Sequence, residues 1–583
     1  MARRQPKSAI ISTKADVNGT KNVDAYTCVS VARDPTLRGI AQKQLVRQLS
    51  PLHLEFWKEN LADHPDREMV NTLIDYLEYG VPIGYEGTRQ SLENPNWASV
   101  GRFKEATLKN FKDDVDRGRM MGPFSSPPLP NFVVSPLGAF ERKRSGKVRI
   151  IHDLSWPPGR SVNDGIDPDR CSLQYMTVDD VARACDSYRP SVAFMGKLDL
   201  KDAFKHIVVR PSDWHLLGSA WDPSQFGLNG EKEYYFSTVL EFGCRSSPKL
   251  FDMFADALNY IMKKRGASPD TNHYMDDYIT VENGGERCDA SLDIMLETCD
   301  LAGVDVQHTK VIRSFTCGDF LGIEVDSVKR EFRLSQEKLD EIYHELQKWY
   351  SIKRCTKRQL LSLIGKLIFA SRVVRAGRTF VSRLIELSKK VRYLHYKINM
   401  SKSARQDIEW WLQCMHSHNG VASFPGEWVT SETLNMFTDA SDLGIGAVCG
   451  HEWFSIAFVG SLRWLKQFPI CWRELYALVK AIATWGETLS SKRVTLYIDN
   501  QTVVYCINKG ASRESNMMTL IRTLYLLLAK YDIECKAEYI STVENSSADA
   551  LSRLDVRSFQ RLNPEAWPNM TWPSPILFNE KTI

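Results

Sequence analysis

The chain has 583 residues, of which 43% are hydrophobic and 25% charged, and its formal net charge is +4. This composition is ordinary for folded globular protein, and the length is sufficient for several domains. It has no run of 18 or more apolar residues, and its first 20 residues lack an apolar segment, so we expect neither a membrane span nor a secretory signal.

Thirteen cysteines are dispersed along the chain without a CxxC pair. Their odd number and irregular spacing predict reduced thiols and a cytoplasmic and/or nuclear location. Cys414, His416 and His418 form a compact group of potential zinc ligands. A second ligand cluster at zinc-site spacing is missing, so we interpret them as solvated loop residues.

The first half of the chain predicts a mixed α+β arrangement. Residues 1–50 are expected to be a mobile basic N-terminal segment and residues 51–122 a helical region, broken near Pro65. Residues 123–136 are rich in proline and predict an extended crossing. Strand-like segments then alternate with helical ones up to residue 330. The expected strands are 148–155, 192–200, 233–240 and 278–283, and the expected helices are 247–265 and 288–303.

Residues 331–425 predict a basic, almost wholly helical region. Between Lys348 and Arg405 there are sixteen basic residues and one acid, Glu386, so this span carries +15 and the rest of the chain −11. A basic surface beside acidic modules favours a long polyanion, although a solvated face without a ligand is the alternative. Residues 430–556 then predict strands followed by helices, and residues 557–583 a C-terminal tail.

Three segments in order carry the first candidate site. Asp199 ends an apolar strand in KLDLKDAF, Gly243 lies in EFGCRSSP before a helix, and Asp276 and Asp277 lie at a turn in HYMDDYITV. Neighbouring carboxylates repel one another unless a cation compensates them. Oxygen ligands suit Mg²⁺, and two such ions can serve an in-line phosphoryl transfer.

Four further carboxylates predict a second site. Asp439 and Asp499 end apolar strands, Glu474 is expected to open an amphipathic helix, and Asp549 lies on a late helix. Each acid alone is an ordinary surface charge. If strand ends and helix starts converge at one sheet edge, however, the four together require cations. The pattern therefore indicates a two-metal phosphodiesterase.

The first set of motifs resembles the palm of retroelement reverse transcriptases, and the second resembles the D-E-D-D tetrad of ribonucleases H. The fold this implies is an α+β multidomain right-hand polymerase. Fingers and palm would occupy residues 123–330, a basic thumb and connection 331–425, and a ribonuclease H-like α/β domain 430–556. All seven carboxylates would bind Mg²⁺, two ions per site, with Mn²⁺ as an alternative.

The resemblance also implies roles around the polymerase site. Arg149 would grip the incoming triphosphate with Lys147 beside it in the fingers, because a guanidinium suits bidentate contact with phosphate. Lys310 would protonate pyrophosphate. Phe204 would exclude a 2′-hydroxyl, the alternative being a plain core side chain. Four further residues would line the substrate site: Phe242, Gly243, Tyr274 and Met275. A turn that supports the primer is matched by Phe320, Leu321 and Gly322.

Two features depart from familiar members. Phe242 stands where retroviral enzymes carry glutamine, and the loop 538–549 lacks the histidine of many ribonucleases H. The segments 213–221 and 362–384 and the NSSADALSR ending look most like DIRS-type retrotransposons, with Gypsy-type elements as the alternative.

The implied activity is RNA-directed, and also DNA-directed, DNA synthesis with cleavage of the RNA in the hybrid. The implied partners are an RNA template, a DNA primer, the RNA–DNA hybrid and dNTPs, without a membrane. A domesticated or defective copy that only binds nucleic acid is the alternative, and the sequence does not indicate an oligomeric state.

Overall fold

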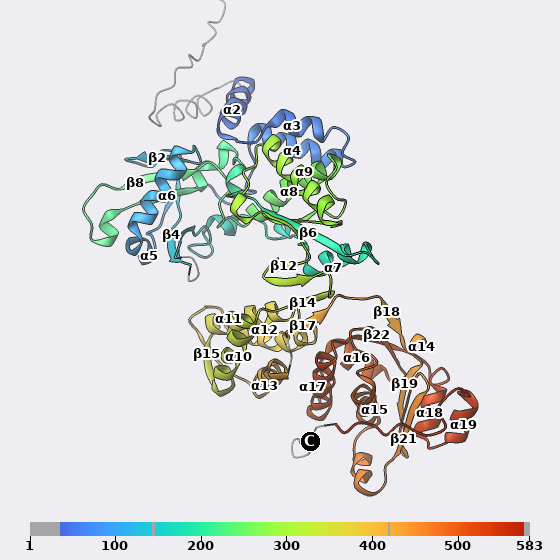
Figure 1. Ribbon diagram of the computed structural model, residues 1–583. Coiled ribbons are helices and arrows are strands. Elements are labelled where there is room, and N and C mark those ends of the chain that lie inside the picture. Colours follow the sequence, from blue (N-terminus) through green and yellow to red (C-terminus); the bar gives the residue numbers. More distant parts are fainter. Residues whose placement is uncertain (1–34, 143–145, 418–419, 577–583) are drawn as a thin grey trace, which may run out of the picture. The chain divides into compact units, whose positions relative to one another are not determined.

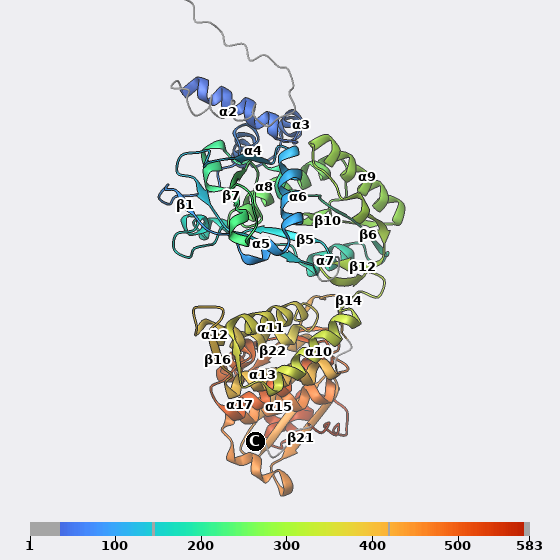
Figure 2. The same cartoon turned by 90° about the vertical axis from the view of Figure 1, so that its left-hand side faces the viewer.

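The structure is a computed structural model that describes residues 35–142, 146–417 and 420–576 (Figures 1 and 2). The chain divides into two compact units. One comprises Met1–Thr177 and Phe194–Phe315, and the other comprises Val178–Ala193 and Thr316–Ile583. Within the described ranges, no helix combines the length and the apolar character needed to cross a bilayer.

The first unit contains two main sheets. A five-stranded sheet has the order β1-β3-β7-β8-β2, and a four-stranded sheet has the order β11-β6-β10-β9. The strands are β1 (Leu92–Glu93), β2 (Met120–Phe124), β3 (Val133–Val134), β6 (Ala193–Asp199), β7 (Gly218–Trp221), β8 (Glu233–Ser237), β9 (Asn272–Tyr274), β10 (Asp277–Asn283) and β11 (Ile312–Phe315). A separate hairpin is formed by β4 (Leu137–Glu141) and β5 (Val148–His152).

Helices complete the first unit, some packed on strands and others, such as α2 and α3, packed on helices. They are α2 (Pro35–Leu49), α3 (Leu54–Asn60), α4 (Arg67–Tyr79), α5 (Ala98–Arg102), α6 (Lys104–Asp116), α8 (Ser247–Lys264) and α9 (Gly285–Ala302). Helix α8 contacts β9, and α9 contacts β10 and β11. The apolar residues of α8 recur at helical spacing, so Leu250, Phe254 and Leu258 are all buried.

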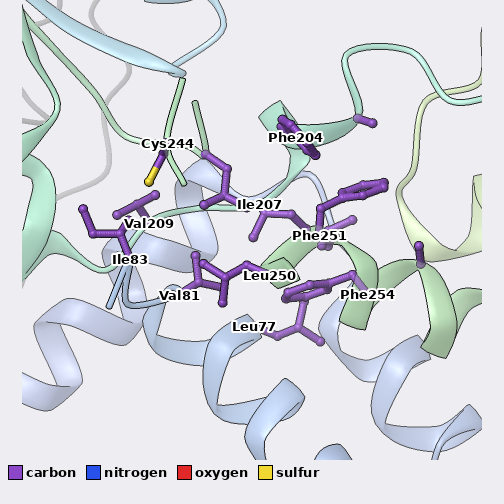
Figure 3. Close-up of a cluster of buried hydrophobic side chains, with 14 of the residues drawn as sticks. Leu77, Val81, Ile83, Phe204, Ile207, Val209, Cys244, Leu250, Phe251 and Phe254 are labelled. Atoms are coloured by element: carbon purple, nitrogen blue, oxygen red, sulfur yellow. The ribbon is translucent and has the colours of Figure 1, made fainter. Parts of the chain in front are cut away.

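A large apolar core anchors the strand that carries Asp199. Figure 3 shows part of this core, in which Leu77 and Val81 pack with Ile207, Phe251 and Phe254. The core is extended by Trp57, whose indole N–H donates to the carbonyl of Ala302 at 3.0 Å. Because close-packed interiors deform little, this core holds the end of β6 in a fixed position.

The second unit begins with α7 (Val178–Ser187) and a sheet in the order β12-β13-β14-β17. Its strands are β12 (Cys317–Phe320), β13 (Ile323–Asp326), β14 (Glu331–Arg333) and β17 (Val421–Ser423). The helices α10 (Gln336–Ser351), α11 (Lys357–Ala370), α12 (Ser382–Lys389) and α13 (Lys402–Ser417) follow, with α13 packed against α10. Between them, β15 (Arg354–Thr356) pairs with β16 (Lys397–Asn399).

The C-terminal half of the second unit mixes antiparallel and parallel strands. β19 (Met436–Ala440), β20 (Gly444–Cys449) and β21 (Glu452–Ala457) are antiparallel, whereas β18 (Trp428–Thr430), β22 (Arg493–Ile498) and β23 (Glu534–Tyr539) are parallel. β19 contacts β22, and α15 (Ile470–Trp485) packs across β19 and β20. The remaining helices are α14 (Ser431–Leu434), α16 (Gln501–Lys509), α17 (Ser515–Lys530), α18 (Ser546–Ser552) and α19 (Val556–Leu562).

Several expected boundaries differ from the ends of the elements and units in the structure. Residues 1–50 were expected to be mobile, but residues 35–49 form α2, in which Leu45 and Val46 are buried; residues 1–34 lie outside the described ranges. Helix α7 joins the second unit because Arg330 pairs with Asp186, and the units divide at residues 315 and 316, not at 330.

The expected C-terminal tail and the expected, almost wholly helical region 331–425 also differ from the structure. Residues 557–562 belong to α19, in which Phe559 is fully buried, and the N–H of Thr571 donates to the carbonyl of Trp453 at 2.8 Å. The region 331–425 contains strands as well as helices. Cys414 is a buried helical residue and not a solvated loop residue, and His418 lies outside the described ranges.

Candidate active sites

The first site is built where β6 ends beside the β9–β10 hairpin. Asp199 is the last residue of β6, and Asp277 is the first residue of β10. Met275 adopts a left-handed φ of 56°, which tightens the turn between the strands. The N–H of Leu200 donates to the carbonyl of Asp276 at 2.9 Å, so the turn is fixed to the end of β6. The structure therefore brings Asp199, Asp276 and Asp277 together.

These three carboxylates affect one another electrostatically. Burial and the negative charges of Asp276 and Asp199 raise the pKa of Asp277 to about 6. Burial and Asp199 also raise the pKa of Asp276, while Lys310 and Arg149 oppose that rise. The Lys310 ammonium lies 2.7 Å from an Asp199 oxygen. The pKa values of Asp276 and Asp277 stay raised although Lys310, Arg149 and Lys197 oppose the rise. A set of converging carboxylate oxygens of this kind fits divalent cations.

A short bridge beside β6 positions Lys310. Leu200 and Val306 form an isolated antiparallel bridge, and the N–H of Gln307 donates to the carbonyl of Asp199 at 2.8 Å. His206 supports the bridge, because its Nε2 accepts the N–H of Asp305 at 2.9 Å. Its other ring nitrogen lies 3.2 Å from the carbonyl of Ala203, which defines a neutral ring with the proton on Nδ1.

The aromatic residues expected to line the substrate site differ in how exposed their rings are. Phe204 is only 6% exposed and packs against Phe242 and Phe251, with ring centroids 4.7 and 5.3 Å away. Phe242 is 62% exposed, so it presents the accessible ring of this cluster. Tyr274 packs against Tyr175, with centroids 5.0 Å apart.

Gly243 and the β4–β5 hairpin complete the surroundings. A Cβ on Gly243 would lie 1.9 Å from the carbonyl oxygen of His152, so only glycine fits there. Lys147 and Arg149 are exposed on the hairpin, and Arg149 interacts electrostatically with Asp276. The expected primer-supporting turn is present, with Leu321 and Gly322 both at positive φ, but it belongs to the second unit.

The second site lies wholly in the second unit. Asp439 lies in β19, Glu474 in α15, and Asp499 directly after β22. Ligand oxygens of these three residues all lie within 4.8 Å of one another. Glu474 was expected to open its helix, but α15 begins at Ile470, so Glu474 lies in the second turn.

Burial and mutual repulsion make the carboxyls of the second site weaker acids than usual. The pKa of Glu474 is raised to about 8 and that of Asp439 to about 6, in both cases first by burial and then by neighbouring carboxylates. Glu474 Oε2 and Asp499 Oδ1 are buried oxygens without a hydrogen-bond partner. Unpartnered buried oxygens that converge on one point are the donor set that a divalent cation requires.

Asp549 is the fourth expected ligand, and unlike the other acids it is bonded to a basic side chain. It lies on α18, and both of its oxygens accept hydrogen bonds from Arg553 Nε, at 2.8 and 2.9 Å. Its charge still raises the pKa of Asp439 and of Asp499, so it lies near the other three acids. The loop before it contains Asn545, which is fully buried and donates to the carbonyl of Thr438 at 3.1 Å.

Two protein families match the segments of the chain that contain these sites. Residues 152–325 match the family described as "Reverse transcriptase (RNA-dependent DNA polymerase)", and residues 430–531 match the "RNase H-like domain found in reverse transcriptase". The chain joins a reverse transcriptase domain to a ribonuclease H-like domain. These are the domains of an RNA-directed DNA polymerase and ribonuclease H enzyme, in a retroelement-like protein.

Solved structures similar to this reverse transcriptase include foamy viral protease–reverse transcriptases. One, described as the foamy viral protease-reverse transcriptase dRH in complex with double-stranded DNA, is 15% identical with a TM-score of 0.45, over 83% of this chain and 81% of that one. Another, in complex with an RNA/DNA hybrid, is 15% identical with a TM-score of 0.44, over 83% and 62%. No curated protein matches the chain.

The polymerase residues Asp199, Asp276, Asp277 and Lys310 lie inside the matched reverse transcriptase segment, whereas Lys147 and Arg149 precede it. The matched ribonuclease H segment includes Asp439, Glu474 and Asp499 but ends before Asp549. The sequence interpretation missed three residues of the two sites: His206, Asn545 and Arg553. Each lies four to seven residues from a motif carboxylate, but their contacts are long-range or depend on side-chain direction, so spacing alone did not reveal them.

Proposed function

We propose that this reverse transcriptase copies RNA into DNA at Asp199, Asp276 and Asp277 and cuts the RNA of the resulting hybrid at Asp439, Glu474, Asp499 and Asp549. The observation that carries the proposal is the presence of two separate carboxylate clusters. The first cluster lies inside the segment that matches the reverse transcriptase family. Three acids of the second cluster lie inside the segment that matches the ribonuclease H-like family, and Asp549 follows that segment. A protein that only binds nucleic acid gains nothing from two sets of costly buried acids.

The clusters would hold Mg²⁺, two ions per site, or Mn²⁺. When bound, the ions would activate the attacking oxygen and stabilise the charge on the leaving group. Lys310 would hold a proton for the pyrophosphate at its ammonium, 2.7 Å from Asp199. Arg149 would orient the triphosphate from the β4–β5 hairpin. Phe204, with Phe242 over it, would exclude a ribonucleotide by steric contact with a 2′-hydroxyl.

The proposed partners are an RNA template, a DNA primer, their hybrid and dNTPs. Fingers and palm are assigned to the first unit, with thumb and connection on the helices α10 to α13. Their basic residues would hold the duplex through its phosphates, without sequence preference. We further propose a DIRS-type element as the origin, on the segments 213–221 and 362–384, and action in the cytoplasm and/or nucleus.

A gel assay with purified protein, Mg²⁺ and a DNA primer on an RNA template tests the proposal. Primer extension is expected to vanish in Asp276→Asn and to persist in Glu474→Gln, and hybrid cleavage is expected to show the opposite dependence. Asp442→Asn, a change at an exposed carboxylate next to the second site, is the matched control and should retain both activities. Binding without either activity in the wild type would instead favour a defective copy that only binds nucleic acid.

A further inference from the structure

A short turn in the helical part of the second unit exposes several aromatic rings together. Residues 392–397, which lie after α12 and end on the first residue of β16, are all exposed, and we call residues 391–397 the aromatic–basic turn. Tyr393 and Tyr396 are each 45% exposed and Leu394 is 46% exposed. Large side chains are normally exposed singly on a surface, so their concentration in one turn requires an explanation.

The rings are held in place by the fold. Tyr393 lies 5.1 Å from Tyr396 and 5.9 Å from His395, measured between ring centroids. The first turn of α11 supports them, because the N–H of Lys357 donates to the carbonyl of Tyr396 at 2.9 Å. The Lys357 ammonium also donates to the carbonyl of Val391 at 2.7 Å. The turn is therefore a preformed platform, which reduces the entropy that a ligand must overcome on binding.

Cations surround this platform. Arg354 and Lys397 extend from the paired strands β15 and β16, Arg358 lies on α11, and Lys390 and Arg392 flank the rings. Among the described residues, none of these five forms an ion pair with an acid. Elsewhere in the same basic span, Lys366, Arg375, Arg383 and Lys389 are paired with acids. Five of the twelve bases of this span that have no ion pair among the described residues are thus gathered where the rings are exposed.

We propose that the aromatic–basic turn binds single-stranded RNA, with unpaired bases stacked on Tyr393 and Tyr396 and phosphates held by the surrounding cations. Ring faces can stack on unpaired bases, whereas the bases of a duplex are already stacked on each other. The combination of ring and charge therefore selects a single strand over the duplex proposed for the helices. The choice of RNA rests on the proposed function, because the RNA template is the strand that such an enzyme must manage before copying.

Fluorescence anisotropy with the full chain tests this inference. The variant carries Tyr393→Ala and Tyr396→Ala, and the matched control carries Tyr505→Ala and Trp572→Ala, which remove two exposed rings elsewhere in the same unit. The probes are a labelled 20-nucleotide single-stranded RNA and a blunt 20-base-pair RNA–DNA duplex. We expect the turn variant to bind the single strand at least about tenfold more weakly, with duplex binding changed less than about threefold. The control should bind both as the wild type does.

Three results would overturn the proposal. An equal loss of affinity for both probes would mean that the turn contacts the duplex or supports the fold. An unchanged thermal midpoint of the turn variant would exclude the second of these explanations. No loss on either probe would also overturn the proposal. The turn would then be assigned to a membrane if the protein binds anionic vesicles, and to a protein partner if it does not. Photocrosslinking of wild-type protein to 4-thiouridine RNA, followed by peptide mapping, is expected to label residues 391–397. Labelling found only outside that turn is the third result that would overturn the proposal.

A single-nucleotide extension assay distinguishes failure of this inference from failure of the proposed function. The DNA primer is paired with an RNA template that has a 5′ overhang of one nucleotide, and extension should be unaffected in the turn variant, because only the templating base is single-stranded. If wild-type protein fails to extend any primer but the turn variant alone loses single-strand binding, the enzyme assignment fails and the present inference stands.

Discussion

At the scale of single residues, each acid cluster carries one exposed base bonded to one of its carboxylates. Lys310 bonds to Asp199 and Arg553 bonds to Asp549, and their side chains are 60% and 61% exposed. Such bases lower the repulsion among the acids while no metal is bound. Because both are exposed, they can swing into solvent when a divalent cation takes their place.

The raised pKa values of the second site predict how the metal-free protein responds to pH. Glu474 has a pKa of about 8 and Asp439 of about 6 in the folded chain, against ordinary values of 4.5 and 3.8. The folded state therefore binds more protons than the unfolded state between these values, so its stability falls as pH rises. We expect the thermal midpoint in chelator to fall from pH 5.5 to pH 8.5, and millimolar Mg²⁺ to restore it at the higher pH.

The variant Glu474→Gln isolates this contribution from other titrating groups. It lacks the carboxyl whose charging destabilises the fold, so its midpoint should fall less over the same pH range. Scanning calorimetry at several pH values measures the difference. A fall as steep as that of the wild type would show that Glu474 is not buried in this way.

At the scale of elements, a fully buried carboxylate joins the helical region to the ribonuclease H-like domain. Asp407 on α13 accepts hydrogen bonds from Arg383 on α12, at 2.6 and 2.7 Å, and from Arg522 on α17, at 3.0 Å. Its side chain is 0% exposed. Removing one partner of a buried ionic group leaves uncompensated charge, which is more costly than the loss of an exposed pair.

Substitution Asp407→Ala is therefore expected to destabilise the second unit by about 3–5 kcal/mol. The matched control is Glu386→Ala, which removes an exposed acid paired with Lys389 and should cost less than about 1 kcal/mol. Urea unfolding, followed by tryptophan fluorescence, measures both. Equal effects of the two substitutions would contradict the structural role assigned to Asp407.

Long periodic elements could be predicted from the sequence, whereas short pairings could not. The strands and helices around Asp199 and Asp276 follow from their apolar patterns. By contrast, β15 and β16 are three residues each, too short to show a period, and they pair across more than forty residues. Helix α7 was not predicted, and its place in the second unit depends on a distant partner, Arg330. Pairing between distant residues is set by packing, which local pattern does not encode.

At the scale of the whole molecule, charge is unevenly distributed. The span 348–405 carries +15 while the rest of the chain carries −11. Four of its sixteen bases are engaged in ion pairs within the described residues, which leaves at most twelve for a nucleic-acid ligand. Counterions released from the phosphates then make binding depend on salt.

We therefore expect the affinity for a template–primer duplex to fall steeply with ionic strength. With about six to ten phosphate contacts, it should fall by roughly 10³–10⁵-fold between 50 and 200 mM salt. Duplexes of unrelated sequence should give the same slope, because phosphates carry no sequence information. Anisotropy titrations at several salt concentrations measure it, and a flat dependence would contradict a role for the basic span.

The assignment of α7 to the second unit has a practical consequence for dissecting the protein. The chain passes between the units at residues 177, 193 and 315, so neither unit is one continuous stretch of sequence. A fragment ending at residue 315 would keep α7 but lose Arg330 and Arg375, which pair with Asp186 and Asp179. Truncation at this single point would therefore leave α7 without its ion-pair partners in the second unit. Independent halves instead require a redesigned connection across residues 178–193.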